Sequence, residues 1–377
     1  MIVDKIFLKN YRNYENLNLK FCNGINIIIG DNAQGKTNIL ESIYFLSITR
    51  SYRTLDDFNL ITYGKEFAKI SAKIKQDNVP KKLEIIINKK NKSLFLNENP
   101  IKKVSKYIGL LNVVIVAPED IEIIKGSPTN RRNFFNIELS KLEKNYINIY
   151  NEYNKLLKIR NDYLKLLVVN NLSDNRYLDI VSEKLIERAV NIYIYRNNLI
   201  NELNSIIGDI YYDLTGIEGL NIKYLPNIEL DNFENEILRK SLKHTLIKYS
   251  KKEFSLGMTL YGPHRDEFKF LLKDKDIKYF GSQGQQKLAI ISIKLALIKI
   301  YEKKLGYIPV LLLDDIFSEL DKKKKNKLIN YINDASQVII TTNDIRDINK
   351  KKLNNLKIFE IKNKKIIEKG DKNDKSK

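Results

Sequence analysis

One segment of eight residues constrains the fold of this chain more than any other: Gly30-Asp31-Asn32-Ala33-Gln34-Gly35-Lys36-Thr37. It fits the pattern G-x-x-x-x-G-K-[ST] of a phosphate-binding P-loop. Residues 24–29 before it predict a short buried strand, and residues 38–43 after it predict the opening of a helix. In such a loop, backbone N–H groups and the positive end of the helix dipole hold anionic oxygens. This context favours a nucleotide site over a chance match in a glycine turn.

The pattern also assigns roles to single side chains. Lys36 is expected to reach the β- and γ-phosphates, and the Thr37 hydroxyl is expected to ligate Mg²⁺. We therefore predict ATP and Mg²⁺ as cofactors, with nucleotide contacts from Gly30, Asp31, Asn32, Ala33, Gln34, Gly35, Lys36, Thr37 and Asn38. Arg12 is a further candidate to stack on or pair with the nucleotide, although a solvated turn arginine fits its position equally well.

Composition limits the cellular setting and the partner. The formal net charge of +20 favours a polyanionic partner such as nucleic acid, although the abundance of Lys, Asn and Ile is also typical of codon bias. The longest apolar run, 108–117, is interrupted by Asn112 and is shorter than the about 18 residues of a spanning helix. The first residues lack the apolar core of a signal peptide. The single cysteine, Cys22, excludes an internal disulfide. We expect a cytoplasmic protein with no membrane partner.

Most of the first third of the chain predicts β structure. Residues 1–29 predict a strand pair that leads into the P-loop strand. Residues 67–100 predict strands joined by turns at 76–78 and 97–100, which indicates a sheet-rich lobe beside the nucleotide site. A further buried strand is predicted at 113–116.

Two basic segments and one histidine are candidates for functional roles. The segment 49–53 combines arginines with a tyrosine, which is typical either of phosphate or base contact or of the cations at a helix end. Arg131 and Arg132 begin a helix and oppose its dipole, so we expect an anionic partner there. His264 and Arg265 lie in a glycine–proline turn with no visible nucleophile, which favours a structural or DNA-facing role over catalysis.

A helical pattern separates the two halves of the chain. From residue 138 to about 207, apolar residues recur every three to four positions on both sides of a polar turn at 170–175. Arg160 and Arg196 each fill one position of this apolar seam. We predict an antiparallel helical hairpin, a short arm about 45 Å long. The predicted domains are residues 1–136 (P-loop and β lobe), 137–250 (helical arm) and 251–377 (the rest of the ATPase head).

The second half of an ATP site follows the arm. The segment 281–287 opens an apolar helix, and Ser282 and Gly284 offer a hydroxyl and free N–H groups to an anion, although Ser-Gln-Gly is also an ordinary N-cap. The apolar strand 309–313 ends in Asp314 and Asp315, a Walker B pattern that predicts a Mg²⁺ residue and a residue that orients the attacking water. A D-loop at 318–321 and a buried strand at 337–342 follow. The candidate catalytic residues are thus Asp315, Lys36, Ser282 and Gly284, and the candidate metal residues are Thr37 and Asp314.

The order of these segments resembles that of an ABC-type ATPase head. That resemblance implies an α/β fold, in which a P-loop sheet lobe and an antiparallel β lobe carry the helical-hairpin arm as an insertion. It also implies that the segment 281–287, the signature loop, lies too far from its own P-loop and completes the site of a second copy. ATP would then hold a homodimer together, and hydrolysis would release it.

A set of segments in matching order carries a closer resemblance: 8–13, 30–38, 40–44, 50–53, 117–120, 131–135, 262–266, 282–286 and 313–321. From residue 2 to about 367 the chain resembles the RecF family of bacterial DNA replication and repair proteins. It departs from the family pattern at Asn136, where an acid is expected, at Lys287, which replaces an arginine, and at Gly281, which replaces a small non-glycine residue. None of these changes removes a phosphate-, magnesium- or water-orienting group.

The resemblance implies an ATP-dependent dimer and a weak, DNA-stimulated ATPase that binds DNA at single-strand gaps or junctions with duplex. With RecO and RecR, such a protein helps load RecA during fork repair and the SOS response. A transporter-associated ATPase is disfavoured because no histidine follows the strand 337–342. An SMC-like chromosome-organising head remains the alternative, but it needs a long coiled coil with a hinge or a zinc hook.

Overall fold

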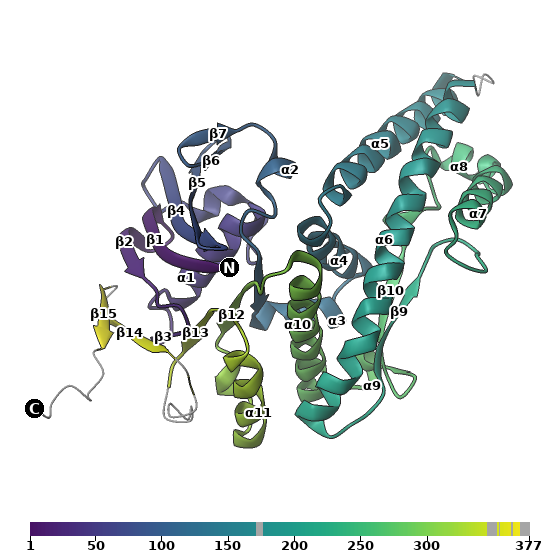
Figure 1. Cartoon of the computed structure of the whole chain (residues 1–377). Helices are drawn as coiled ribbons and strands as arrows, with labels where there is room; N and C mark the ends of the chain where they lie inside the picture. Colours follow the sequence, from purple (N-terminus) through teal and green to yellow (C-terminus); the bar gives the residue numbers. More distant parts are fainter. Residues whose placement is uncertain (171–175, 345–352, 354, 363–364, 370–377) are drawn as a thin grey trace, which may run out of the picture. The chain divides into compact units, whose positions relative to one another are not determined.

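The computed structural model describes residues 1–170, 176–344, 353, 355–362 and 365–369 (Figure 1). Its chain forms two compact units. The first comprises Met1–Ile121, Asp209–Ile217 and Lys287–Lys377, and the second comprises Glu122–Gly208 and Glu218–Gln286.

The predicted domain boundaries differ from the edges of these units. The boundary after residue 136 falls inside helix α4 (Pro128–Leu142), and the one after residue 250 falls at the start of α8 (Ser250–Leu256). The reason is tertiary packing, because α4 packs on strand β10 (Glu267–Leu272), with the rings of Phe135 and Phe268 4.3 Å apart. Residues on both sides of the predicted arm therefore belong to the second unit.

A mostly parallel sheet carries the P-loop in the first unit. Its described strands run in the order β15-β14-β3-β13-β12-β8. Their bounds are β3 (Ile25–Ile29), β8 (Val113–Val116), β12 (Val310–Asp314), β13 (Val338–Thr342), β14 (Leu356–Lys362) and β15 (Lys365–Lys369). Strands β8, β12 and β13 are buried along their whole length, as expected for a sheet covered on both faces. Parallel strands end at one edge, so the residues after β3, β12 and β13 meet there.

An antiparallel sheet forms the second layer of this unit. Its order is β2-β1-β4-β5-β6-β7. The strands are β1 (Ile2–Tyr11), β2 (Tyr14–Lys20), β4 (Phe67–Gln76), β5 (Val79–Asn88), β6 (Lys92–Leu96) and β7 (Asn99–Ile101). The predicted β lobe is thus confirmed, with turns at residues 77–78 and 97–98 that have positive φ. The strand pair predicted before the P-loop strand is also present, but it joins this sheet and not the parallel one.

Helix α1 (Lys36–Ile48) contacts both sheets. That position explains why its sequence lacks a polar face, since nearly all of its residues are buried. The other α-helices with described residues in this unit are α2 (Val104–Tyr107), α10 (Gln283–Leu305) and α11 (Lys322–Asn333), together with the C-terminal part of α6 (Arg176–Thr215) from Asp209 and the first residue of α3 (Ile121–Lys125).

The second unit contains the predicted helical hairpin. Helices α5 (Tyr146–Asn170) and α6 (Arg176–Thr215) run antiparallel. Four contacts between the helices show this direction, because the residue numbers rise along α5 while they fall along α6. The contacts join Tyr146 with Tyr195, Glu152 with Arg188, Arg160 with Ser182, and Tyr163 with Tyr177. The hairpin begins at residue 146, later than predicted, and α6 continues beyond residue 207. Residues 171–175 of the predicted turn lie outside the described residues.

The rest of this unit is a small sheet with short helices. Its described elements are α3 (Ile121–Lys125), β9 (Leu220–Leu225), α7 (Asn235–Lys248), β11 (Lys275–Asp276) and α9 (Ile277–Phe280), in addition to α4, α8 and β10. The sheet order is β11-β10-β9. No helix among the described residues of the chain is both long and apolar enough to span a membrane.

Buried ion pairs explain the arginines that interrupt the helical pattern. Arg160 contacts Glu253 at 2.7 Å, and Arg196 contacts Asp266 at 2.6 Å, with all four side chains almost fully buried. The anionic partner expected at the start of α4 is also present, since Arg131 makes two hydrogen bonds of 2.6 and 2.8 Å to the Glu267 carboxylate. Charge thus compensates the helix-start arginine.

His264 has a structural environment in the same unit. One ring nitrogen lies 2.6 Å from the Tyr153 hydroxyl, and the other lies 3.2 Å from the Thr259 carbonyl oxygen. Burial lowers the pKa of His264 to about 4, so the ring stays neutral at physiological pH. These contacts support the structural reading of the glycine–proline turn.

Candidate nucleotide site

The P-loop connects β3 to α1 through backbone conformations that few residues adopt. Gly35 has φ of 101°, and a Cβ atom added there would lie 2.5 Å from the Asn13 side chain and 2.8 Å from the Tyr14 hydroxyl oxygen. Only glycine fits this position. No side chain caps the start of α1 at Gly35. The first N–H groups of the helix are therefore available to an anion.

Lys36 is held at this loop by three oxygen acceptors. Its Nζ donates to the carbonyl oxygens of Gly30 and Asp31 at 2.6 and 2.8 Å, and to Asn343 Oδ1 at 2.7 Å. Burial lowers the pKa of Lys36, and the carboxylates of Asp315 and Asp314 oppose that shift. Sequence reasoning missed Asn343. Its position directly after β13, beside the P-loop strand, was the available signal.

The two predicted metal residues lie in contact. Thr37 Oγ1 donates to Asp314 Oδ1 at 3.0 Å, and Thr341 Oγ1 donates to the same oxygen at 2.6 Å. The Tyr52 hydroxyl donates to the other carboxylate oxygen at 3.3 Å. Hydroxyl and carboxylate oxygens are ligands that Mg²⁺ prefers, so Thr37 and Asp314 fit the role predicted for them.

Asp315 follows β12 in a left-handed conformation with φ of 51°. Its backbone N–H donates to the carbonyl and hydroxyl oxygens of Thr341, both at 3.1 Å. Thr341 thus orients both acids of the Walker B segment, a role that sequence reasoning did not assign. In the predicted D-loop, the side chains of Ser318 and Glu319 lie outside the described part of the chain.

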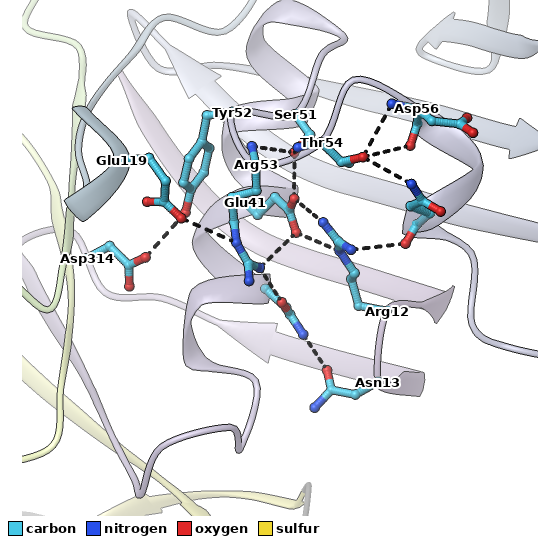
Figure 2. Close-up of polar contacts among 12 residues, drawn as sticks. Arg12, Asn13, Glu41, Ser51, Tyr52, Arg53, Thr54, Asp56, Glu119 and Asp314 are labelled. Atoms are coloured by element: carbon cyan, nitrogen blue, oxygen red, sulfur yellow. Dashed lines mark hydrogen bonds and ion pairs between the residues drawn. The ribbon is translucent and has the colours of Figure 1, made fainter. Parts of the chain in front are cut away.

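The carboxylate of Glu41, on α1, is fully buried and is the shared partner of several side chains around the P-loop helix (Figure 2). Arg12 donates to it through Nε at 2.9 Å and Nη2 at 2.6 Å, and Ser51 Oγ donates at 2.6 Å. The remaining Arg12 nitrogen, Nη1, donates to the Asn59 carbonyl oxygen at 3.0 Å. These hydrogen bonds use three of the five guanidinium N–H groups, so both predicted contacts with a nucleotide, stacking and pairing, stay predictions.

The basic–aromatic segment 49–53 belongs to the same network. Arg53 Nη1 donates to Asn38 Oδ1 at 2.9 Å, and Arg53 also lies 3.6 Å from Glu119. Asn38 in turn donates to the Asn13 side chain, whose amide donates to the Gln34 carbonyl oxygen of the P-loop. The segment therefore contacts the P-loop indirectly, through Asn38 and Asn13. It also contacts the Asp314 carboxylate directly, through the Tyr52 hydroxyl (Figure 2).

The signature residues Ser282 and Gly284 belong to the second unit, whereas the P-loop and Walker B residues belong to the first. Both are exposed at the start of α10. Ser282 and Gln285 make reciprocal hydrogen bonds of 2.8 and 3.2 Å, so the N-cap role left open by the sequence is present. A Cβ atom added to Gly284 would meet no atom of the described residues within 4 Å, so their packing does not require glycine there.

Comparison with known proteins identifies the family. The model for the RecF/RecN/SMC N terminal domain matches residues 2–367. The DNA replication and repair protein RecF of Geobacillus sp. (strain WCH70) is 39% identical over 92% of this chain and 94% of that protein. The chain belongs to the RecF family. RecF of Ligilactobacillus salivarius is also 39% identical and covers 98% of both chains.

Solved structures agree with the RecF assignment. The recombination mediator protein RecF with ATP, in the RecFOR pathway, has a TM-score of 0.90 at 32% identity and covers 98% of this chain and 97% of that one. An SMC head bound to the C-winged helix domain of ScpA shares the fold with a TM-score of 0.57 at 17% identity. The predicted ABC-type, SMC-like head is thus confirmed, and among these relatives the RecF structures are the more similar.

Proposed function

We propose that this chain is an ATP-gated DNA clamp of recombinational repair. The observation that carries the proposal is the meeting of Lys36, Thr37 and Asp314 at one edge of the parallel sheet, next to the open N-terminus of α1. The similarity to RecF structures with ATP supports nucleotide binding at this edge.

In this proposal each residue has a defined task. Lys36 leaves its three oxygen acceptors and neutralises phosphate charge, and Thr37 and Asp314 hold Mg²⁺. The metal neutralises charge that develops on the phosphate oxygens. Asp315 orients the attacking water, and Ser282 and Gly284 of a second copy close the pocket. Turnover would be slow and limited by opening of the dimer.

The similarity to RecF proteins supports a proposal for the cellular role. We propose action in the cytoplasm at single-strand gaps and duplex junctions, where the ATP-bound dimer helps RecO and RecR load RecA and supports the SOS response. The RecFOR pathway of the solved RecF structures supports these partners. DNA would stimulate the weak ATPase by favouring the closed dimer.

A row of lysines on the antiparallel sheet supports contact with the DNA backbone. Lys20, Lys5, Lys73 and Lys82 lie directly opposite one another on β2, β1, β4 and β5. Like charges in such cross-strand pairs destabilise a sheet. Lys82 pairs with Glu98 at 2.9 Å, but the other three make no ion pair with any described residue. A phosphate backbone would relieve this repulsion across about 14 Å of sheet.

Removing two charges from this lysine row tests the contact. The double variant Lys5→Gln/Lys73→Gln should weaken duplex DNA binding and lower the slope of log K against log salt by about 2. The free energy of unfolding should stay the same or rise, because a repulsion is removed. Lys303→Gln/Lys322→Gln makes the same change in net charge at exposed lysines outside the row. Equal salt slopes for the two double variants would exclude the row from the DNA interface.

The variant Asp315→Asn tests whether ATP hydrolysis opens the dimer. The amide keeps the size of the carboxylate but accepts a water proton poorly, so ATP hydrolysis should fall by roughly 100- to 1,000-fold. ATP-bound dimers should then accumulate and retain DNA longer, as measured by DNA dissociation after competitor is added with ATP present. Rapid DNA release from this variant would remove Asp315 from the hydrolytic role.

A further inference from the structure

One hollow of the second unit has no role in the clamp described above. It has a volume of about 580 Å³, within the usual size of a ligand site. Its lining includes one face of α7, the segment after β9 and two tyrosines. All of these residues belong to the second unit.

The face of α7 that lines this hollow carries two lysines without an ion-pair partner among the described residues. Lys240, His244 and Lys248 follow one another at four-residue intervals, which places the two lysines about 12 Å apart along the helix. Neither lysine makes an ion pair with a described residue. The hollow also contains one described acid, Glu229, so its lining is on balance basic.

The neighbouring face of the same helix differs. There, Arg239 and Lys243 both contact Glu183, at 3.3 and 2.6 Å. The cations of α7 are therefore neutralised within the protein on one face and available to a ligand on the other.

The other wall of the hollow offers flat aromatic surface and a hydrogen-bond acceptor. The rings of Tyr249 and Tyr261 stack with centroids 4.3 Å apart, and Lys248 Nζ lies 5.4 Å from the Tyr249 ring centre. Asn227 Oδ1 is buried without a hydrogen-bond partner among the described residues. Buried amide oxygens normally have a donor, and the exocyclic amines of nucleobases are such donors.

We infer that this hollow, the α7 groove, binds single-stranded DNA. The two lysines fit phosphates of one strand, the tyrosine pair fits a stacked base, and the Asn227 oxygen fits a base amine. Duplex DNA keeps its bases inside the helix and leaves the tyrosines unused, and an acidic peptide would leave the stacking surface unused. The inference rests on the proposed DNA-binding function and assigns the single-stranded part of its substrate to a place.

The test measures binding of a labelled oligodeoxycytidylate, which has a base amine, by fluorescence anisotropy without nucleotide. Lys240→Gln/Lys248→Gln should weaken binding at least about 10-fold and lower the salt slope by about 1.4. Arg239→Gln/Lys243→Gln changes the net charge of the same helix equally and should bind like the unmodified chain. Tyr261→Leu should lose roughly 5- to 150-fold, whereas Tyr261→Phe, which keeps the ring, should bind normally.

Three outcomes would overturn the inference. One is equal binding by the groove variant and its control on α7, and another is an equal loss for duplex and single strand in Tyr261→Leu. The third is displacement of the oligonucleotide by an oligoglutamate peptide at lower concentration than by unlabelled single strand, which would assign the groove to an acidic protein partner. The binding assay contains no nucleotide, so its result does not depend on whether ATP induces a dimer. Sedimentation with ATP tests the ATP-induced dimer separately.

Discussion

Lys36→Met is expected to abolish ATP-induced dimer formation. The Nζ of Lys36 is the cation at the mouth of the P-loop, within 2.8 Å of three oxygen acceptors that a phosphate would replace. Methionine keeps the length of the side chain but removes its charge and its donors. A charged hydrogen bond is worth about 1.5–3 kcal/mol, so ATP affinity should fall roughly 10- to 150-fold from one such bond. Sedimentation velocity with ATP, in the Asp315→Asn background, measures the dimer.

Two controls separate charge from structure in this experiment. Lys36→Arg keeps the cation and should retain more dimer than Lys36→Met, although the planar guanidinium fits the loop less well. Lys303→Met removes an exposed lysine on α10 and should dimerise normally. If Lys36→Met forms dimers with ATP as the parent does, the P-loop assignment is wrong.

Asp266→Asn is expected to lower the free energy of unfolding by about 3–5 kcal/mol. Asp266 is fully buried and accepts hydrogen bonds from Arg196 at 2.6 Å, from the Asn227 N–H at 2.9 Å and from the Tyr224 hydroxyl. Loss of the carboxylate charge leaves the buried Arg196 guanidinium without its counter-ion. Urea unfolding monitored by circular dichroism at the helical band measures the loss.

The matched control for this pair is Glu183→Gln. Glu183 also pairs with a lysine at 2.6 Å, but both side chains are more than a third exposed. Exposed pairs contribute about 0–1 kcal/mol, so this variant should unfold almost like the parent. The double variant Arg196→Met/Asp266→Asn should lose less than the sum of its single variants. A change below about 1 kcal/mol for Asp266→Asn would contradict the view of this pair as a core element of the second unit.

Local patterns in the sequence predicted much of the first unit. The P-loop is contiguous, and its chemistry comes from backbone N–H groups and one lysine, so eight residues were enough to predict it. Residues 113–116 and 310–313 are apolar throughout because the parallel sheet is covered on both faces. The meeting of Thr37 with Asp314 could also be anticipated, since parallel strands place their carboxyl ends at one edge.

The tertiary structure decided which distant side chains meet. Asn343 at Lys36, and Thr341 and Tyr52 at Asp314, depend on strand register and on a loop that returns to the site. Glu41 looks like an ordinary helix residue in the sequence, yet packing between the sheets buries it and makes it the partner of Arg12.

Sequence by itself therefore determined the fold class and the phosphate-binding loop, because both arise from periodicity and from contacts between neighbours in the chain. The unit boundaries, the lysine row and the α7 groove were decided only in three dimensions. The lysine row depends on which strands pair and in which register, and the α7 groove depends on which face of the helix is already neutralised by an acid. The unit boundaries depend on which distant elements pack together. No local pattern in the sequence carries this information.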